Sequence, residues 1–266
     1  MSDPRTPIHA FLRPYLKDGW NDLALREGFH RHLDLLGARK SPLEAPTAPP
    51  PGQGLGTGAD AVSGAGEAPT ADAGGLSDAP AFFAELRKGL GRLNSDDQVQ
   101  GFEFLLSKMA HWPIAWAAYG LATAWHETAH RMQPVREGLD VSDAYRRRNF
   151  RYYPWYGRGY PQTTWEENYR KADEKLGLGG TLIANPDRML EPDIAADTMI
   201  RGMEEGWFSG DKQGRHTLAR HLPRDREATR AEFRPARRII NIMDKADKIA
   251  GEAEAIQAAL KAGGWR

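Results

Sequence analysis

The 266-residue sequence contains no cysteine, and this absence excludes disulfide bonds and thiolate metal sites. No apolar run reaches the roughly 18 residues of a membrane-spanning helix, so we predict no stable membrane insertion. The sequence also has no excess charge, because 36 Lys and Arg residues balance 36 Asp and Glu residues. Nucleic-acid-binding proteins are typically basic, and we therefore expect no nucleic-acid partner.

A signal peptide is also missing from the first residues. The chain begins with the polar run Met1 to Arg5, and no apolar stretch of signal-peptide length follows. We therefore expect synthesis in the cytoplasm. Any action outside it would need a separate delivery factor.

Residues 41–80 lack aromatic side chains, Lys and Arg, and 24 of these 40 residues are Ala, Gly or Pro. Such a segment buries too little apolar surface to offset the entropy lost on ordering. It is predicted to be a disordered, flexible linker, stiffened locally by three consecutive prolines at 49–51. The linker would separate residues 1–40 from a domain at 81–266.

Residues 1–40 have apolar side chains at helical spacing on both sides of Gly19-Trp20, which predicts two short amphipathic helices. Two such helices are too small to form a stable core alone. This short helical N-terminal element of unknown role either docks on a wall, a membrane or a partner, or packs on the main domain.

The apolar pattern of residues 81–266 is helical almost throughout, which predicts a mostly α fold. Ser95 is a candidate N-cap for a helix that runs to about Met109. An alanine-rich helix from about Pro113 to Met132 is expected to be central, because small side chains allow close packing. The other predicted helices cover 165–176, 192–206 and 233–261, and 149–161 is predicted to be irregular.

Residues 126–130 read His-Glu-Thr-Ala-His, the H-E-x-x-H spacing that places two imidazoles on one face of a helix. In a zinc metallopeptidase His126 and His130 would bind the metal and Glu127 would be the general base. A zinc site also needs a third ligand, which a downstream glutamate such as Glu166 or Glu167 could supply. The extended motif fails, because Gln133 and Arg136 stand where it requires Gly and His. Zinc peptidase activity stays open as an alternative.

Glu127 and Glu137 form a second candidate pair. Glycoside hydrolysis needs one protonated carboxylic acid at the leaving oxygen and one carboxylate on the opposite face. Glu127 is predicted on an apolar helix beside Trp125, where burial favours the protonated acid. Glu137 follows Pro134 and is expected outside the helix, where the adjacent Arg136 would keep it ionised. Two carboxyl groups in different environments suit an acid and a base.

The most specific pattern runs from Tyr156 to Tyr169. It reads Tyr-Gly-Arg-Gly, two variable residues, Gln162, one residue, Thr164, three residues, then Asn168-Tyr169. In order and spacing it resembles glycoside hydrolase family 19, which comprises plant-type chitinases and bacteriophage endolysins.

Other segments extend this resemblance to roughly residues 93–260. The family carries a helix that ends in His-Glu-Thr, which is matched at 126–128. The endolysin branch has a second Glu about ten positions later, which is matched by Glu137. Further matches lie at 185–187, 195–196 and 237–241.

The resemblance implies a lysozyme-like α-helical glycosidase domain and three catalytic residues. Glu127 would donate a proton to the glycosidic oxygen. Glu137 would activate a water molecule for attack from the other face, which inverts the anomeric centre. The hydroxyl of Thr164 would help to hold that water. No metal or cofactor is implied.

The resemblance also implies a set of substrate-binding residues. Tyr156 would offer a platform for a sugar ring, and amide side chains would suit the hydroxyl and N-acetyl groups of an amino sugar. Ile242 follows Asn241 where the family usually has Gly. The implied substrate-binding residues are His126, Tyr156, Gln162, Asn168 and Asn241.

Other residues of this region have structural interpretations. Gly157 and Gly159 permit a tight turn, and Arg158 is predicted to bind carboxylates or carbonyls within the fold. Most of the aromatic side chains between 150 and 160 are expected to be packing residues. The run Arg146-Arg147-Arg148 is typical of a solvated face, and contact with an anionic wall is the alternative.

The implied activity is that of an endolysin, which cleaves β-1,4 bonds between the amino sugars of peptidoglycan. Chitin is the alternative substrate within the same family. Such an enzyme would act on the cell wall as a monomer, and a holin or another delivery system would have to bring it there. A toxin secreted by a contact-dependent apparatus would also fit.

Overall fold

The structure is a computed structural model that describes residues 75–91 and 93–266. The predicted helical element at 1–40 and the predicted linker up to residue 74 lie outside the described residues. The described part is mostly helical, as predicted. Its helices are α3 (Ala79–Leu90), α4 (Asp96–Lys108), α5 (Ile114–Glu127), α6 (Asp143–Asn149), α7 (Glu166–Leu176), α8 (Thr181–Ala184), η1 (Pro186–Leu190), α9 (Pro192–Glu205), α10 (Leu218–His221), α11 (Arg230–Ala236), η2 (Arg237–Ile239) and α12 (Ala246–Ala262).

The strands of the described part are short and form two antiparallel pairs. In the first pair Val135 lies opposite Gly159. In the second, Gly210 lies opposite Arg215. The strands are β1 (Val135–Arg136), β2 (Arg158–Gly159), β3 (Gly210–Asp211) and β4 (Gly214–Arg215).

Helix α3 begins at Ala79, two residues before the predicted boundary of the domain. The side chain of Asp78 accepts a hydrogen bond from the backbone N–H of Ala81, which caps the helix. The backbone N–H groups of Ser77 and Asp78 both donate to the carbonyl of Gly263. The start of the described chain is therefore bonded to its C-terminal end.

Ser95 caps α4 as predicted. Its hydroxyl accepts a hydrogen bond from the N–H of Gln98, and the Gln98 side chain accepts one from the N–H of Ser95. This reciprocal pair satisfies two N–H groups that the first turn of a helix leaves free.

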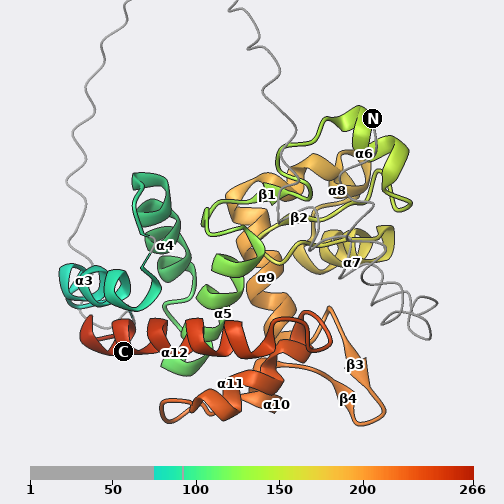
Figure 1. Cartoon of the computed structure of the whole chain (residues 1–266). Helices are drawn as coiled ribbons and strands as arrows, with labels where there is room; N and C mark the ends of the chain where they lie inside the picture. The colour runs from blue at the N-terminus through green and yellow to red at the C-terminus, as the bar shows by residue number, and fades with distance from the viewer. Residues whose placement is uncertain (1–74, 92) are drawn as a thin grey trace, which may run out of the picture.

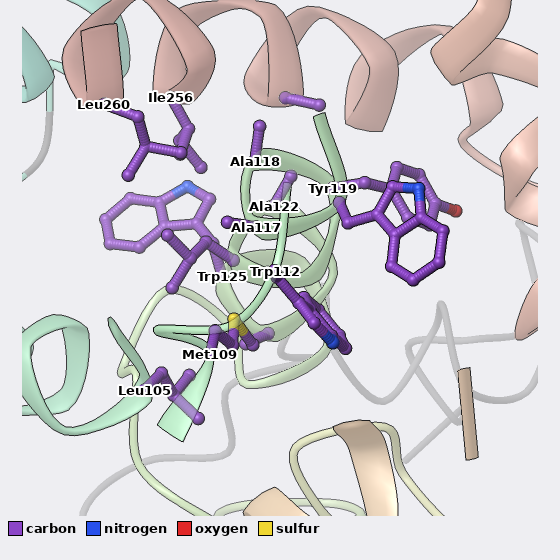
Figure 2. Packing of buried hydrophobic residues seen from close by; sticks show 14 of the residues in the cluster. Leu105, Met109, Trp112, Ala117, Ala118, Tyr119, Ala122, Trp125, Ile256 and Leu260 are labelled. Atoms are coloured by element: carbon purple, nitrogen blue, oxygen red, sulfur yellow. The ribbon is translucent and has the colours of Figure 1, made fainter. Parts of the chain in front are cut away.

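Helix α5 is central, as its composition predicts. Every residue from Ala115 to Trp125 is buried, so the helix is covered on all sides. In Figure 1, α12 runs along α3 and α5, and the segment from β1 to α8 lies on the far side of α5 from α3. Figure 2 shows the small side chains of Ala118 and Ala122 on α5 lying toward α12, which contributes Ile256 and Leu260. Alanines on α5 thus allow the two helices to approach closely.

The predicted helix at 233–261 is wrong in extent. The structure divides this range into α11, η2 and α12, with an interruption after Ile239. Lys245, directly before α12, has a φ of 57°, which no α-helix accommodates. The interruption places Arg237 at the start of a short 3₁₀ turn rather than within a long helix.

A second, smaller apolar cluster lies in the region from β1 to α9. Its buried members include Tyr169 of α7, Met189 of η1 and Ile194 of α9. Helix α9 connects it to the main core, to which Ala195 and Met199 belong. Within the described residues no helix combines the length and the apolar character needed to cross a membrane.

Candidate active site

Glu127 and Glu137 line the same small pocket. Glu127 is the last residue of α5, and Glu137 directly follows β1. Both are nearly inaccessible, with 4% and 5% of their surface exposed. The sequence predicts that these two carboxyl groups act together, and in the structure they line one pocket. The pocket is lined by Glu127, Val135, Arg136, Glu137, Gly138, Leu139 and Gln162.

Helix α5 ends at Glu127, not near Met132 as the apolar pattern predicted. The hydroxyl of Thr128 donates to the carbonyl of Ala124 and accepts from the N–H of Met132. Ala129 and His130 then take left-handed backbone conformations, with φ of 50° and 68°. Because these angles stop the helix, Glu127 stands at its end, beside the pocket.

Arg237 forms an ion pair with Glu127, and the sequence reasoning did not identify it as a site residue. Its Nη1 lies 2.7 Å from Glu127 Oε1, and both side chains are almost fully buried. Its Nε donates to the carbonyl of Asp244, which fixes the guanidinium. The arginine supplies the opposite charge that a buried carboxylate requires. In the sequence, the family resemblance at residues 237–241 is the feature that could have indicated Arg237.

The carboxylate of Glu137 accepts two hydrogen bonds. Tyr152 Oη donates to Oε1 at 2.7 Å, and the backbone N–H of Gly157 donates to Oε2 at 2.8 Å. The backbone N–H of Glu137 in turn donates to the carbonyl of Gly157. The two donors fix the orientation of the carboxylate oxygens. The guanidinium of Arg136, which the sequence places next to Glu137, bonds Asp187 and Tyr156.

Gly157 allows the loop to approach the Glu137 carboxylate. A Cβ atom at this position would lie 2.9 Å from Gln162 Oε1 and 3.1 Å from Glu137 Oε2. Gly157 therefore has a role at the site beyond the tight turn. Gly159 has a φ of 79° and supplies that turn.

Arg158 holds the aromatic segment together, as predicted. Its Nε contacts Asp187 at 2.8 Å, and its Nη1 donates to the carbonyl of Pro154 and to the hydroxyl of Tyr169. The guanidinium also lies 3.6 Å from the ring centroid of Tyr156. These contacts make Arg158 a structural residue.

Tyr156 is not placed to act as the predicted sugar platform. Only 1% of its surface is exposed, because the loop folds over it and Arg158 covers its ring. A ligand ring has no access to this side chain. Its hydroxyl accepts a hydrogen bond from Arg136, so Tyr156 supports the wall of the pocket.

Gln162, Thr164 and Asn168 are linked by hydrogen bonds. Gln162 lines the pocket, and its Nε2 donates to the carbonyls of Val135 and Gly159. The hydroxyl of Thr164 donates to the carbonyl of Gln162, and Asn168 Nδ2 donates to the carbonyl of Thr164. Thr164 and Asn168 therefore lie one step behind the pocket lining. The predicted contact of Thr164 with a water molecule remains a prediction.

His126 does not line the pocket. Its buried Nδ1 has no hydrogen-bond partner and lies 4.0 Å from Glu252 Oε2, while His130 Nε2 lies 3.9 Å from Glu252 Oε1. Burial lowers the pKa of His126 to about 4 and raises the pKa of Glu252 above its usual range. His126 is therefore neutral at physiological pH.

The H-E-x-x-H segment does not form the helical arrangement that its spacing suggested. Since α5 ends at Glu127 and His130 has left-handed backbone angles, the two histidines do not lie on successive turns of one helix. Glu127 is paired with Arg237, on a different segment. Across residues 75–91 and 93–266, no group of three or more His, Asp or Glu residues has an arrangement that could hold a metal ion.

Asn241 lies outside the pocket lining. Its side-chain oxygen accepts a hydrogen bond from the N–H of the next residue, Ile242, and its own N–H donates to the carbonyl of Arg237. Asn241 thus closes the turn that carries Arg237. The predicted substrate contact of Asn241 has no support in these bonds.

A larger open groove lies between α3, α11 and α12. Half of the residues that line it are charged, and two of these, Lys261 and Glu227, form an ion pair at 2.7 Å. No buried acid–base pair faces this groove. The small pocket between Glu127 and Glu137 is the better candidate site, because general acid–base chemistry requires such a pair.

With two buried carboxyl groups that have different partners, one can donate a proton to a bound molecule while the other accepts a proton from it. Glu127 has an arginine beside it, while Glu137 has a hydroxyl and a backbone N–H. Comparisons with known proteins add nothing to this geometry, since no family model, curated protein or solved structure matches the chain.

Proposed function

We propose that the protein is a glycosidase of the endolysin type, with a lysozyme-like domain that hydrolyses β-1,4 bonds between the amino sugars of peptidoglycan. One observation carries the proposal. Glu127 and Glu137 come from separate segments, are both buried, and line one pocket. The motif from Tyr156 to Tyr169, which resembles family 19, supports the same activity, because its Gly157 donates a hydrogen bond to the Glu137 carboxylate.

In the proposed reaction, Glu127 is protonated when substrate is bound and gives its proton to the glycosidic oxygen as the C–O bond breaks. Arg237 then stabilises the carboxylate that remains. Glu137 removes a proton from a water molecule whose oxygen bonds to the anomeric carbon from the opposite face, so the configuration inverts. Tyr152 and the backbone N–H of Gly157 hold the Glu137 carboxylate in place for this step.

Several features of the proposed setting come from the sequence alone. The substrate is the peptidoglycan glycan strand, the enzyme works as a monomer without a metal or cofactor, and it binds no nucleic acid. A holin or another delivery system brings it to the cell wall. Chitin is the competing substrate of the same chemistry, and a zinc peptidase is the competing class.

Mass spectrometry of the products released from purified peptidoglycan sacculi tests this function. We expect disaccharide-peptides with new reducing ends, in equal yield with and without EDTA. Chito-oligosaccharides serve as the parallel substrate. Peptides released from intact glycan strands, and lost on addition of EDTA, would contradict the proposal and support the zinc peptidase.

A further inference from the structure

A continuous series of side-chain contacts leads from Glu137 to the protein surface. The first contact is the hydrogen bond from Tyr152 to the Glu137 carboxylate. The ring of Tyr152 packs edge-on against Trp165, with centroids 5.2 Å apart. The guanidinium of Arg151 lies 5.1 Å from the centroid of Trp165. Arg151 is exposed, while Tyr152 and Trp165 are half-buried.

Trp165 is held in an unusual backbone conformation. Its φ is 77°, which an aromatic residue rarely adopts, since its Cβ crowds the backbone there. The N–H of Trp165 donates to the carbonyl of Trp155, and its carbonyl accepts from Asn168 and Tyr169. These bonds fix the indole beside Tyr152, and such strain is commonly found at functional sites.

The segment that carries this aromatic pair is rich in arginine. Between Asp143 and Glu166 the sequence has five arginines and no acidic residue. Arg146 and Arg158 are buried and bond carbonyl groups of the fold. The other three, Arg147, Arg148 and Arg151, are exposed. Arg147 pairs with Asp143, and Glu166 and Glu167 directly follow Trp165, so charges of both signs lie along this segment. Arg151 is the arginine that contacts the indole of Trp165, where a cation can meet an anionic substituent on a bound glycan.

We propose that Arg151, Trp165 and Tyr152 form a substrate subsite next to Glu137 that selects amino-sugar glycans carrying carboxylate groups. The apolar faces of Trp165 and Tyr152 pack against a sugar ring, and Arg151 binds a carboxylate of its substituent. The carboxylate belongs to the stem peptide or to the lactyl group of the sugar. This inference rests on the proposed function and deepens it, because uncharged chitin offers Arg151 nothing to bind.

Binding measurements on an inactive background test the subsite. In Glu127→Gln protein, the Kd is measured for three soluble ligands: glycan strands with stem peptides, amidase-treated strands with free lactyl carboxylates, and chito-oligosaccharides. We expect Arg151→Gln to weaken binding of a carboxylate-bearing strand about three- to fivefold, as for one solvent-exposed charge pair. Its effect on chito-oligosaccharides should be much smaller, and Arg151→Lys should restore part of the difference.

Two further variants complete the comparison. Trp165→Ala should weaken binding of all three ligands, because it removes stacking rather than charge. Arg230→Gln is the matched control, since Arg230 is an exposed arginine on α11, beside the larger groove. Thermal unfolding of each variant verifies that it is folded.

The outcomes separate the subsite from the proposed function. Loss of binding with peptide-bearing strands alone identifies a carboxylate of the stem peptide, and loss with amidase-treated strands alone identifies the lactyl carboxylate. Loss with both means that Arg151 binds either carboxylate. Equal effects of Arg151→Gln on all three ligands, or none on any, would overturn the subsite even if the wild-type protein digests sacculi. Selective loss in a protein that digests no sacculi would overturn the proposed function and leave the subsite standing.

Discussion

The two regions that meet at the pocket are held together in different ways. The region around α5 is an apolar core, in which Trp125 and Tyr119 pack among alanines and leucines (Figure 2). The region from β1 to η1 has a small apolar cluster and depends on hydrogen-bonded arginines. In it Arg158 and Arg136 share the carboxylate of Asp187, and Arg146 holds the carbonyls of Glu137 and Gly138.

This difference extends to the two carboxylates. Glu127 stands at the end of a rigid, fully packed helix and is paired with one buried charge. Glu137 stands on the loop after β1, and two neutral donors from the segment between α6 and β2 hold it. Packing of α5 fixes the position of Glu127 in the fold. The hydrogen-bond donors around Glu137 fix both the position and the orientation of its carboxylate, because hydrogen bonds are directional. The proposed acid is therefore positioned by helix packing and an ion pair, and the proposed base by hydrogen bonds.

Replacement of each carboxylate should have the largest effect on turnover of sacculi. We expect Glu127→Gln to reduce the rate about 10³-fold, since an amide has no proton to give the leaving oxygen. Glu137→Gln should cost about 10²-fold, because water can still attack without a base. Release of reducing ends measures both, and exposed Glu103→Gln on α4 is the control. Full activity in either variant would remove that residue from the mechanism.

Replacement of Arg237 should have the largest effect on stability. Arg237→Met leaves the buried Glu127 carboxylate without its charge partner, and we expect a loss of about 3–5 kcal/mol in the free energy of unfolding. The double variant Glu127→Gln/Arg237→Met should recover much of this loss. Urea denaturation measures both.

Arg234→Met is the matched control for this prediction. Arg234 pairs with Asp247 at 2.9 Å, but both side chains are mostly exposed, at 54% and 74%. Its loss should cost under about 1 kcal/mol, because water screens such pairs. Equal losses for Arg234→Met and Arg237→Met would mean that the buried ion pair contributes no more to the free energy of unfolding than an exposed one.

His126 should make the protein less stable in acid. The folded pKa of about 4 lies below the unfolded value near 6.5, so between these pH values the unfolded chain binds a proton that the folded protein excludes. The free energy of unfolding therefore falls as the pH is lowered from 6.5 to 4. The difference of about 2.5 pKa units corresponds to about 3 kcal/mol at most.

A pH series of unfolding curves measures this effect. His126→Gln should flatten the slope between pH 6.5 and 4.5 relative to the wild-type protein. His111→Gln is the control, because the His111 side chain is 61% exposed. The nearby Glu252, whose pKa burial raises, changes stability in the opposite direction in both proteins, so the difference between them isolates His126. An unchanged slope would contradict the burial of His126.

Removal of one donor from Glu137 should have the smallest effect. Tyr152→Phe deletes the hydrogen bond to Oε1 but leaves the Gly157 N–H in place, and we expect about a tenfold lower kcat with little change in stability. Tyr153→Phe is the matched control, since its hydroxyl contacts Arg147 and Asp143 instead. If both variants keep full activity, Tyr152 does not support the base.

Local pattern was sufficient for much of the fold. The capping residue Ser95, the buried alanine-rich α5, and α7 and α9 could all be predicted, because helical periodicity and caps depend on residues within a few positions of one another. The ends of helices were less predictable. Apolar spacing continues to Met132, but left-handed residues after Glu127 end the helix earlier.

For the candidate site, the sequence by itself determined which residue types are present and their order in the loop from Tyr156 to Asn168. Only the tertiary structure decided that Tyr156 is buried, that Arg136 turns to Asp187, and that Arg237 lies against Glu127. The last two residues are 110 positions apart. Contacts at such separations depend on how whole helices pack, and no local pattern of charge or hydropathy records that packing.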